Sequence, residues 1–514
     1  MGFLNKMEDV LLEDFNESVT ENGALGYRTT GKSLLDLNFA VSSLRSAAET
    51  NIAKRFEAAY LEDKLTALKW LFFARDVRGG LGERRVFRAA LRYVAKCDPE
   101  DVRRLIPLVP EYGRFDDLWG LLDEGSLKQT VIDFVSEQLK SDLKHMEKNA
   151  PVSLLAKWLP SPNASSKETK HYAKIIREGL YMAERQYRKT LSKLRAYLKV
   201  VEVQMSAKRW KEIEYESVPS RANLIYNSAF LRNDEERRRA YLAKLERGET
   251  KINASTLFPH DIVCKYGSCY TEDETLEALW KNLPDTVSGA DNGGTVVVAD
   301  GSGSMTARVG NSGVRALDVA NALAIYFAEK LRGEFRDKYI TFSSRPQLVD
   351  FSHANSLRNK IRIARRYDEV SDTNIEAVFD LILSTAVKNC MTQNEIPANI
   401  LIISDMEFNG CARVNGDGYS RFGRTSPTPK LFDAIRNRYE ENGYKLPRLV
   451  FWNVNSRTET IPVRSNELGV ALVSGFSPNV AKMVMSGKLD PYECLLETLN
   501  GERYQPVEDA IMNR

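Results

Sequence analysis

Residues 295–305 read Thr-Val-Val-Val-Ala-Asp-Gly-Ser-Gly-Ser-Met, and this stretch decides the fold class. The run Thr295–Ala299 is apolar or β-branched, which is typical of a strand that is covered on both faces of a parallel sheet. The loop that follows presents Asp300, Ser302 and Ser304 at alternate positions, with glycines between them. Three hard oxygen donors at the carboxyl end of a strand indicate a site for Mg²⁺ or a similar ion rather than for zinc.

The chain after residue 294 alternates apolar strands with helices. The predicted strands are 295–300, 339–342, 347–351, 399–404, 448–453 and 469–474, and the predicted helices are 312–331, 374–387 and 431–442. Strands that alternate with helices imply right-handed crossovers, so this pattern predicts a parallel, doubly wound α/β sheet. Ligands of such sheets bind beyond the carboxyl ends of the strands.

Two further polar side chains fall at that rim of the predicted sheet. Asp405 directly follows the strand 399–404. Thr373 comes earlier in the chain, in the loop that enters the predicted helix 374–387. Three loops from one rim would offer five oxygen donors, two of them carboxylates. The sequence therefore predicts a site for Mg²⁺, or for Mn²⁺ or Ca²⁺, with the following ligands: Asp300, Ser302, Ser304, Thr373 and Asp405.

Length and composition are those of a multidomain globular protein. The chain has 514 residues, of which 43% are hydrophobic and 28% charged. The N-terminus lacks the apolar core of a signal peptide, and no run of about 18 apolar residues occurs. Six scattered cysteines are typical of free thiols in a reducing compartment. We therefore expect a cytoplasmic protein that does not bind membranes.

The N-terminal half has the spacing of packed helices. We expect residues 1–50 to form a loosely packed polar arm and residues 51–285 to form irregular, HEAT-like α-helical repeats. Apolar residues recur three and four positions apart from 58 to 72, and short glycine-containing turns separate the helical runs. A linker with proline and glycine over 281–294 marks the boundary to a C-terminal domain of residues 286–514.

The middle of the chain carries an excess of positive charge. Residues 151–250 contain 21 Lys and Arg against 12 Asp and Glu, whereas the whole chain has a net charge of only +3. Basic residues interleaved with tyrosine and tryptophan favour contacts to phosphate and stacking on bases. The alternative is a solvated helix face in which Glu184 and Glu235 pair with the cations. The candidate nucleic-acid-binding residues are Arg185, Arg188, Lys189, Lys193, Lys208, Arg209, Arg237 and Arg238.

The C-terminal motif resembles a known metal site. Asp300-Gly-Ser-Gly-Ser304, together with Thr373 and Asp405, is similar to the metal-ion-dependent adhesion site of von Willebrand factor A domains. The resemblance covers about 286–514. It implies that the serines and the threonine bind Mg²⁺ directly, that the two aspartates act largely through water, and that an acidic group of a partner completes the shell.

A second resemblance concerns the whole chain. Residues 72–84, Phe-Phe-Ala-Arg-Asp-Val-Arg-Gly-Gly-Leu-Gly-Glu-Arg, resemble the helical-repeat segment of TROVE proteins, the Ro ribonucleoprotein type. Residues 450–455 and 469–478 are typical of a TROVE-related family found in plants, bacteria and viruses. In Ro proteins a ring of helical repeats is closed by an A domain, and the ring binds structured RNA and RNA ends. The resemblance thus implies structured or single-stranded RNA as a partner.

Two functional hypotheses remain, and neither is an enzyme. In the first, the helical repeats bind RNA and the Mg²⁺-binding domain supports the ring or recruits a partner. In the second, the chain is a protein-interaction scaffold whose metal site captures an acidic residue of a partner without RNA. Hydrolysis is disfavoured because only Glu407 lies near the predicted ion as a candidate general base.

Overall fold

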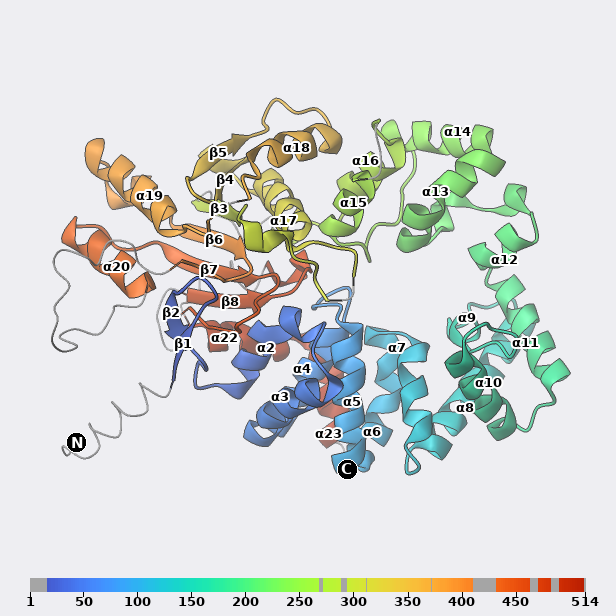
Figure 1. The fold of residues 1–514 in the computed structure, drawn as a ribbon. Coiled ribbons are helices and arrows are strands. Elements are labelled where there is room, and N and C mark those ends of the chain that lie inside the picture. The colour runs from blue at the N-terminus through green and yellow to red at the C-terminus, as the bar shows by residue number, and fades with distance from the viewer. Residues whose placement is uncertain are drawn as a thin grey trace, which may run out of the picture. The chain divides into compact units, whose positions relative to one another are not determined.

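A computed structural model of the chain describes residues 16–267, 271–287, 294–310, 312–370, 372–409, 431–462, 470–481 and 490–512. The chain divides into two compact units, whose elements are labelled in Figure 1. The sheet unit comprises Met1–Glu62, Phe258–Glu272 and Asp285–Thr498. The helical unit comprises Asp63–Leu257, Asp273–Pro284 and Leu499–Arg514. The protein therefore combines a helical unit with an α/β unit.

The sheet unit is built on six strands in the order β5-β4-β3-β6-β7-β8. Their bounds are β3 Thr295–Asp300, β4 Lys338–Phe342, β5 Gln347–Asp350, β6 Asn399–Ser404, β7 Arg448–Asn453 and β8 Val470–Ser474. Five strands run parallel, which matches the prediction, but β5 pairs antiparallel with β4. The reason is the connection, because the four residues 343–346 are enough for a hairpin and too few for a crossover.

Both faces of this sheet are covered by apolar side chains. On β7, Phe451 packs on Phe432 of α20 (Leu431–Glu441) with ring centroids 4.7 Å apart. The next residue, Trp452, packs on Phe327 of α17 (Ala316–Lys330) at 5.1 Å. Successive side chains of a strand point to opposite faces, so these two contacts show helices on both sides. Further helices of the C-terminal part of this unit are α18 Leu357–Ala364, α19 Glu376–Lys388 and α22 Pro491–Leu499.

Residues 16–62 belong to this sheet unit, whereas the prediction placed residues 1–50 in a loosely packed arm. The segment forms β1 Glu17–Val19, β2 Leu25–Tyr27, α2 Ser33–Leu44 and α3 Glu49–Glu62. The backbone N–H of Ser42 donates to Ser474 Oγ at 3.0 Å, and Asn453 Nδ2 donates to the Phe39 carbonyl at 3.0 Å. Nine of the twelve residues of α2 are buried, and such an apolar helix must pack against a partner surface.

The helical unit is an array of short helices, and it includes the chain end that the predicted boundaries assigned to the C-terminal domain. In α23, which packs beside α4 and α6, Glu508 pairs with Lys69 at 2.6 Å. No helix in the described ranges is both long and apolar enough to cross a bilayer. The main helices are α4 Lys64–Arg75, α5 Arg84–Cys97, α6 Pro99–Leu105, α8 Lys128–Glu147, α10 Lys167–Gly179, α11 Glu184–Tyr197, α12 Val201–Ser206, α13 Ser220–Asn233, α14 Glu235–Glu246, α16 Glu274–Lys281 and α23 Gln505–Met512.

Candidate metal centre and nucleic-acid interface

The strand order creates a ligand position between β3 and β6. These strands pair in parallel, and the chain leaves β3 toward β4 on one side and later returns to β6 on the other. A doubly wound sheet opens a crevice at such a reversal, at the carboxyl ends of the two strands. Asp300 ends β3 and Asp405 directly follows β6, so the structure places both predicted carboxylates at this rim.

Both carboxyl groups are buried, but Asp300 accepts more hydrogen bonds than Asp405 does. Asp300 accepts hydrogen bonds from the Ser302 backbone N–H at 2.9 Å and from Ser404 Oγ at 2.6 Å. Asp405 Oδ1 accepts one from the Glu407 backbone N–H at 3.3 Å. Its other oxygen, Oδ2, is buried without a hydrogen-bond partner among the described residues, and the Arg457 guanidinium lies 3.6 Å away.

The electrostatics of this pair favour a bound cation. Burial raises the pKa of Asp300 to about 6. Burial and then the charge of Asp300 raise the pKa of Asp405 to about 7. Two carboxylates in a water-poor site repel each other when both ionise, and an ion between them removes that penalty.

The hydroxyl groups complete an all-oxygen donor set. Ser302 Oγ and Ser304 Oγ lie 3.0 Å apart. Ser304 and Thr373 line one small pocket of about 250 Å³. Hydroxyls and carboxylates without nitrogen or sulfur suit Mg²⁺, Mn²⁺ or Ca²⁺. The residues present therefore fit the predicted ion, and the orphaned Oδ2 of Asp405 is the clearest mark of this fit.

Five of the seven described residues that line this pocket were not among the predicted ligands: Glu21, Asn22, Asp372, Asn409 and Arg457. Glu21 and Asn22 come from the turn between β1 and β2, and Arg457 follows β7. The position of Arg457 could have been predicted, because it lies four residues beyond the end of a parallel strand on the same rim. No sequence pattern predicts that Glu21 and Asn22 line this pocket, because Asn22 and its partner Thr373 lie about 350 residues apart in the chain.

Glu407, the residue considered as a general base, is committed to other partners. Its side chain is fully buried, and Oε1 accepts from the backbone N–H groups of Arg457 at 2.8 Å and Thr458 at 2.9 Å. Oε2 accepts from the backbone N–H of Glu21 at 2.8 Å. A carboxylate with both oxygens engaged by backbone donors fastens loops together and is poorly placed to take a substrate proton.

In the helical unit, four of the eight candidate cations share one exposed face of α11. Arg185, Arg188, Lys189 and Lys193 recur at the three- and four-residue spacing of a single helix face. None of the four forms an ion pair or hydrogen bond with any residue that the structure describes. Glu184, the expected partner, is 3.8 Å from Arg177 instead. The opposite face of α11 is buried through Tyr187, Leu191 and Leu194.

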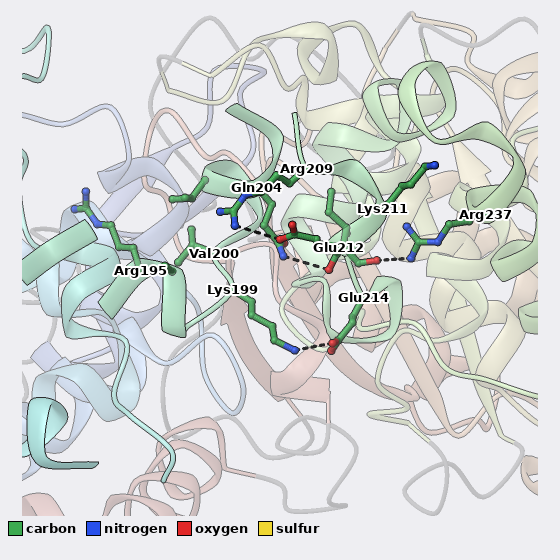
Figure 2. Close-up of a pocket in the computed structure, with 12 residues that line it drawn as sticks. Arg195, Lys199, Val200, Gln204, Arg209, Lys211, Glu212, Glu214 and Arg237 are labelled. Atoms are coloured by element: carbon green, nitrogen blue, oxygen red, sulfur yellow. Dashed lines mark hydrogen bonds and ion pairs between the residues drawn. The ribbon is translucent and has the colours of Figure 1, made fainter. Parts of the chain in front are cut away.

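The neighbouring pocket, shown in Figure 2, is basic in composition but internally paired. It has a volume of about 490 Å³ and lies where α11, α12 and α14 meet. Lys199 pairs with Glu214 at 2.6 Å, and Arg209 pairs with Glu212 at 3.2 Å. Arg237 donates to the Ile213 carbonyl at 2.8 Å. A phosphate in this pocket would have to compete with these contacts, so Arg209 and Arg237 are weaker candidates than the α11 cations. Lys208 is exposed at the end of α12.

Arg238 was predicted to contact nucleic acid, and the structure corrects this. Its side chain is 0% exposed. The guanidinium donates to Asn223 Oδ1 at 3.1 Å and to Asn227 Oδ1 at 3.2 Å. It lies 5.0 Å from the centre of the Tyr215 ring and 5.4 Å from that of Tyr241. Arg238 therefore belongs to the core of the helical unit and is out of reach of a phosphate.

Comparison with known proteins places the chain beside two domain families. Residues 294–508 match a domain of unknown function, DUF7788, and residues 20–107 and 163–290 match another, DUF2828. A protein of Acanthamoeba polyphaga mimivirus, uncharacterized protein L728, is 30% identical over 536 aligned residues, which cover 96% of this chain and 89% of that protein. Among solved structures, the Deinococcus radiodurans RO (RSR) protein aligns with a TM-score of 0.35 and 13% identity, over 87% of this chain and 93% of that one.

Proposed function

The chain belongs to the family of the mimivirus protein L728, and we propose that it is a non-catalytic RNA-binding protein of the Ro type. The helical unit binds RNA through the exposed face of α11, and the sheet unit binds Mg²⁺. The observation that carries the proposal is the set of exposed α11 cations that have no ion-pair or hydrogen-bond partner among the described residues: Arg185, Arg188, Lys189 and Lys193.

Unpaired cations on one helix face favour a polyanion over the alternative of a merely solvated face. Residues 185 and 193 are about 12 Å apart along the helix axis, so the face can reach more than one phosphate. Each phosphate contact releases condensed counterions, which is the main source of sequence-independent affinity for nucleic acid. Lysine and arginine paired with a carboxylate contribute less, because the carboxylate must first be displaced.

In the sheet unit, we propose an adhesion-type metal site. Ser302, Ser304 and Thr373 would hold the ion through their hydroxyls, and Asp300 and Asp405 would supply negative charge to it. A bound Mg²⁺ would supply positive charge to this rim and bind one further oxygen ligand. The proposal is non-catalytic because Glu407 has both carboxylate oxygens engaged by backbone donors.

The second candidate function is a protein-interaction scaffold. One observation favours it, namely that the pocket beside Thr373 also presents Arg457, whose side chain is 38% exposed. An arginine next to a metal site is complementary to an acidic group of a partner protein.

The two functions are separated by recovering RNA with the protein. The full chain is purified at low salt from its native cell, and the bound RNA is quantified and sequenced. The same is done for a variant in which Arg185, Arg188, Lys189 and Lys193 are replaced by glutamine. A matched control replaces the paired cations Lys199 and Arg209 by glutamine. We expect the first variant to lose most of the RNA and the control to keep it. Wild-type protein free of RNA would favour the scaffold instead.

A further inference from the structure

The pocket beside the proposed metal site contains a carboxylate from the far end of the chain. Glu21 and Asn22, in the turn between β1 and β2, line the same pocket of about 250 Å³ as Ser304 and Thr373. All four residues belong to the sheet unit. The turn therefore brings a carboxylate into the pocket that two of the predicted ion ligands line.

Several contacts hold this turn in place. The side chain of Asn22 donates through Nδ2 to Thr373 Oγ1 at 3.2 Å and to the Glu407 carbonyl at 2.6 Å. Thr20 Oγ1 donates to the Phe408 carbonyl at 2.6 Å, and the Glu21 backbone N–H donates to Glu407 Oε2 at 2.8 Å. Contacts from one turn to two of the three loops of the proposed metal site, at Thr373 and at residues 407–408, indicate a built arrangement rather than an accidental approach.

The Glu21 carboxylate is held by a contact that is easily exchanged. Arg457 Nη2 lies 2.6 Å from Glu21 Oε2 and 3.6 Å from Asp405 Oδ2. One nitrogen atom thus stands between Glu21 and the buried Asp405 oxygen that has no hydrogen-bond partner among the described residues. The Glu21 side chain is 54% exposed, and an ion pair this open contributes little to stability.

We infer that Glu21 is the acidic group that completes the metal shell, supplied by the same chain. This inference rests on the proposed Mg²⁺ site. With Mg²⁺ bound at this site, Glu21 would leave Arg457 and provide an oxygen ligand to the ion. The metal site is then closed from within and fastens the β1–β2 turn to the rim of the sheet. An external acidic partner has to displace Glu21 before it can bind.

Mn²⁺ titration of the full chain, with water-proton relaxation as the readout, tests this inference. Mn²⁺ replaces Mg²⁺, and the relaxation rate reports how many water molecules the bound ion keeps. In the variant Glu21→Gln we expect the affinity for Mn²⁺ to fall by about tenfold or more. We also expect higher relaxation per bound ion, because water takes the vacated position. The control Asp372→Asn removes another carboxylate from the same pocket and should leave the relaxation per ion unchanged.

A second variant separates direct ligation from charge alone. Glu21→Asp keeps the charge but shortens the side chain by one methylene, so it should resemble Glu21→Gln if Glu21 is a ligand. Variants that match the wild type in affinity and relaxation would overturn the role of Glu21 while leaving the metal site standing. A wild-type chain that binds no Mn²⁺ would overturn the metal site and this inference together. Hydrogen exchange over residues 16–28 verifies that the turn stays folded in each variant.

Discussion

Replacing Arg238 by methionine should destabilise the helical unit without removing an RNA contact. The guanidinium is buried in a cluster with Tyr215, Phe230 and Tyr241, whose ring centres lie 5.0, 5.3 and 5.4 Å away. Methionine has a similar length and no charge, so the change removes polar and cation–π contacts while leaving only a small cavity.

The expected loss is about 2–4 kcal/mol. Hydrogen bonds to a charged group contribute about 1.5–3 kcal/mol each, and a cation–π contact about 1–2 kcal/mol. Part of this loss of stability is offset, because burial disfavours the charged guanidinium and lowers the pKa of Arg238. Asn227 Oδ1 still accepts from Thr275 Oγ1 at 2.8 Å, so only Asn223 Oδ1 loses its partner.

The assay is hydrogen exchange of the full chain followed by mass spectrometry, together with RNA binding. In Arg238→Met, peptides from α13, α14 and α16 should lose protection, while the affinity of the folded protein for RNA stays close to that of the wild type. Arg239→Met is the control, because Arg239 is exposed and its one ion-pair partner among the described residues is Glu235 on the same helix. Unchanged protection combined with weaker RNA binding would refute the assignment of Arg238 to the core.

Three further outcomes follow from the sheet unit. Asp300→Ala should abolish the rise in melting temperature produced by Mg²⁺ and leave the amount of bound RNA unchanged; a loss of RNA from folded protein would contradict this division of labour. The pKa values of Asp300 and Asp405, raised to about 6 and about 7, make the metal-free chain more stable at low pH, since the neutral carboxyls are lost as pH rises through those values. Thermal melts should therefore show a larger Mg²⁺ effect at pH 8 than at pH 5, and an equal effect would disprove the coupling. Glu407→Gln removes a charged acceptor of three backbone N–H groups and should increase hydrogen exchange over residues 16–28, whereas Glu441→Gln on the surface should not.

The polar residues at the strand ends can be predicted from the sequence, because a buried parallel strand is a continuous apolar run. The strands β3, β6 and β7 lie where the apolar runs predicted them, to the residue. Once the strands are placed, Asp300 and Asp405 must meet at one rim, because β3 and β6 are parallel neighbours. The α/β pattern therefore follows from local sequence, and the meeting of the two carboxylates follows from the strand order.

Contacts between residues far apart in the chain could not be predicted from the sequence. No local pattern shows that the turn at Glu21 reaches Thr373, since their contact depends on the whole sheet unit being assembled. The burial of Arg238 was not predicted for a different reason. Arg238 is the middle one of three successive arginines, and such a run indicates an exposed basic surface. A signal did exist: Arg238, Tyr241 and Leu242 are spaced three and four residues apart, and all three are buried on one face of α14.

The most direct test of the account is the salt dependence of RNA binding. The dissociation constant of a single-stranded RNA is measured for the wild type and for the variant with glutamine at Arg185, Arg188, Lys189 and Lys193. Each neutralised phosphate contributes about 0.7 to the slope of log affinity against log salt for single strands, so loss of four contacts should lower the slope by about 3. We expect the variant to bind more weakly and with this flatter slope. Equal slopes for the two proteins would contradict it, because the α11 face would then carry no phosphate contact.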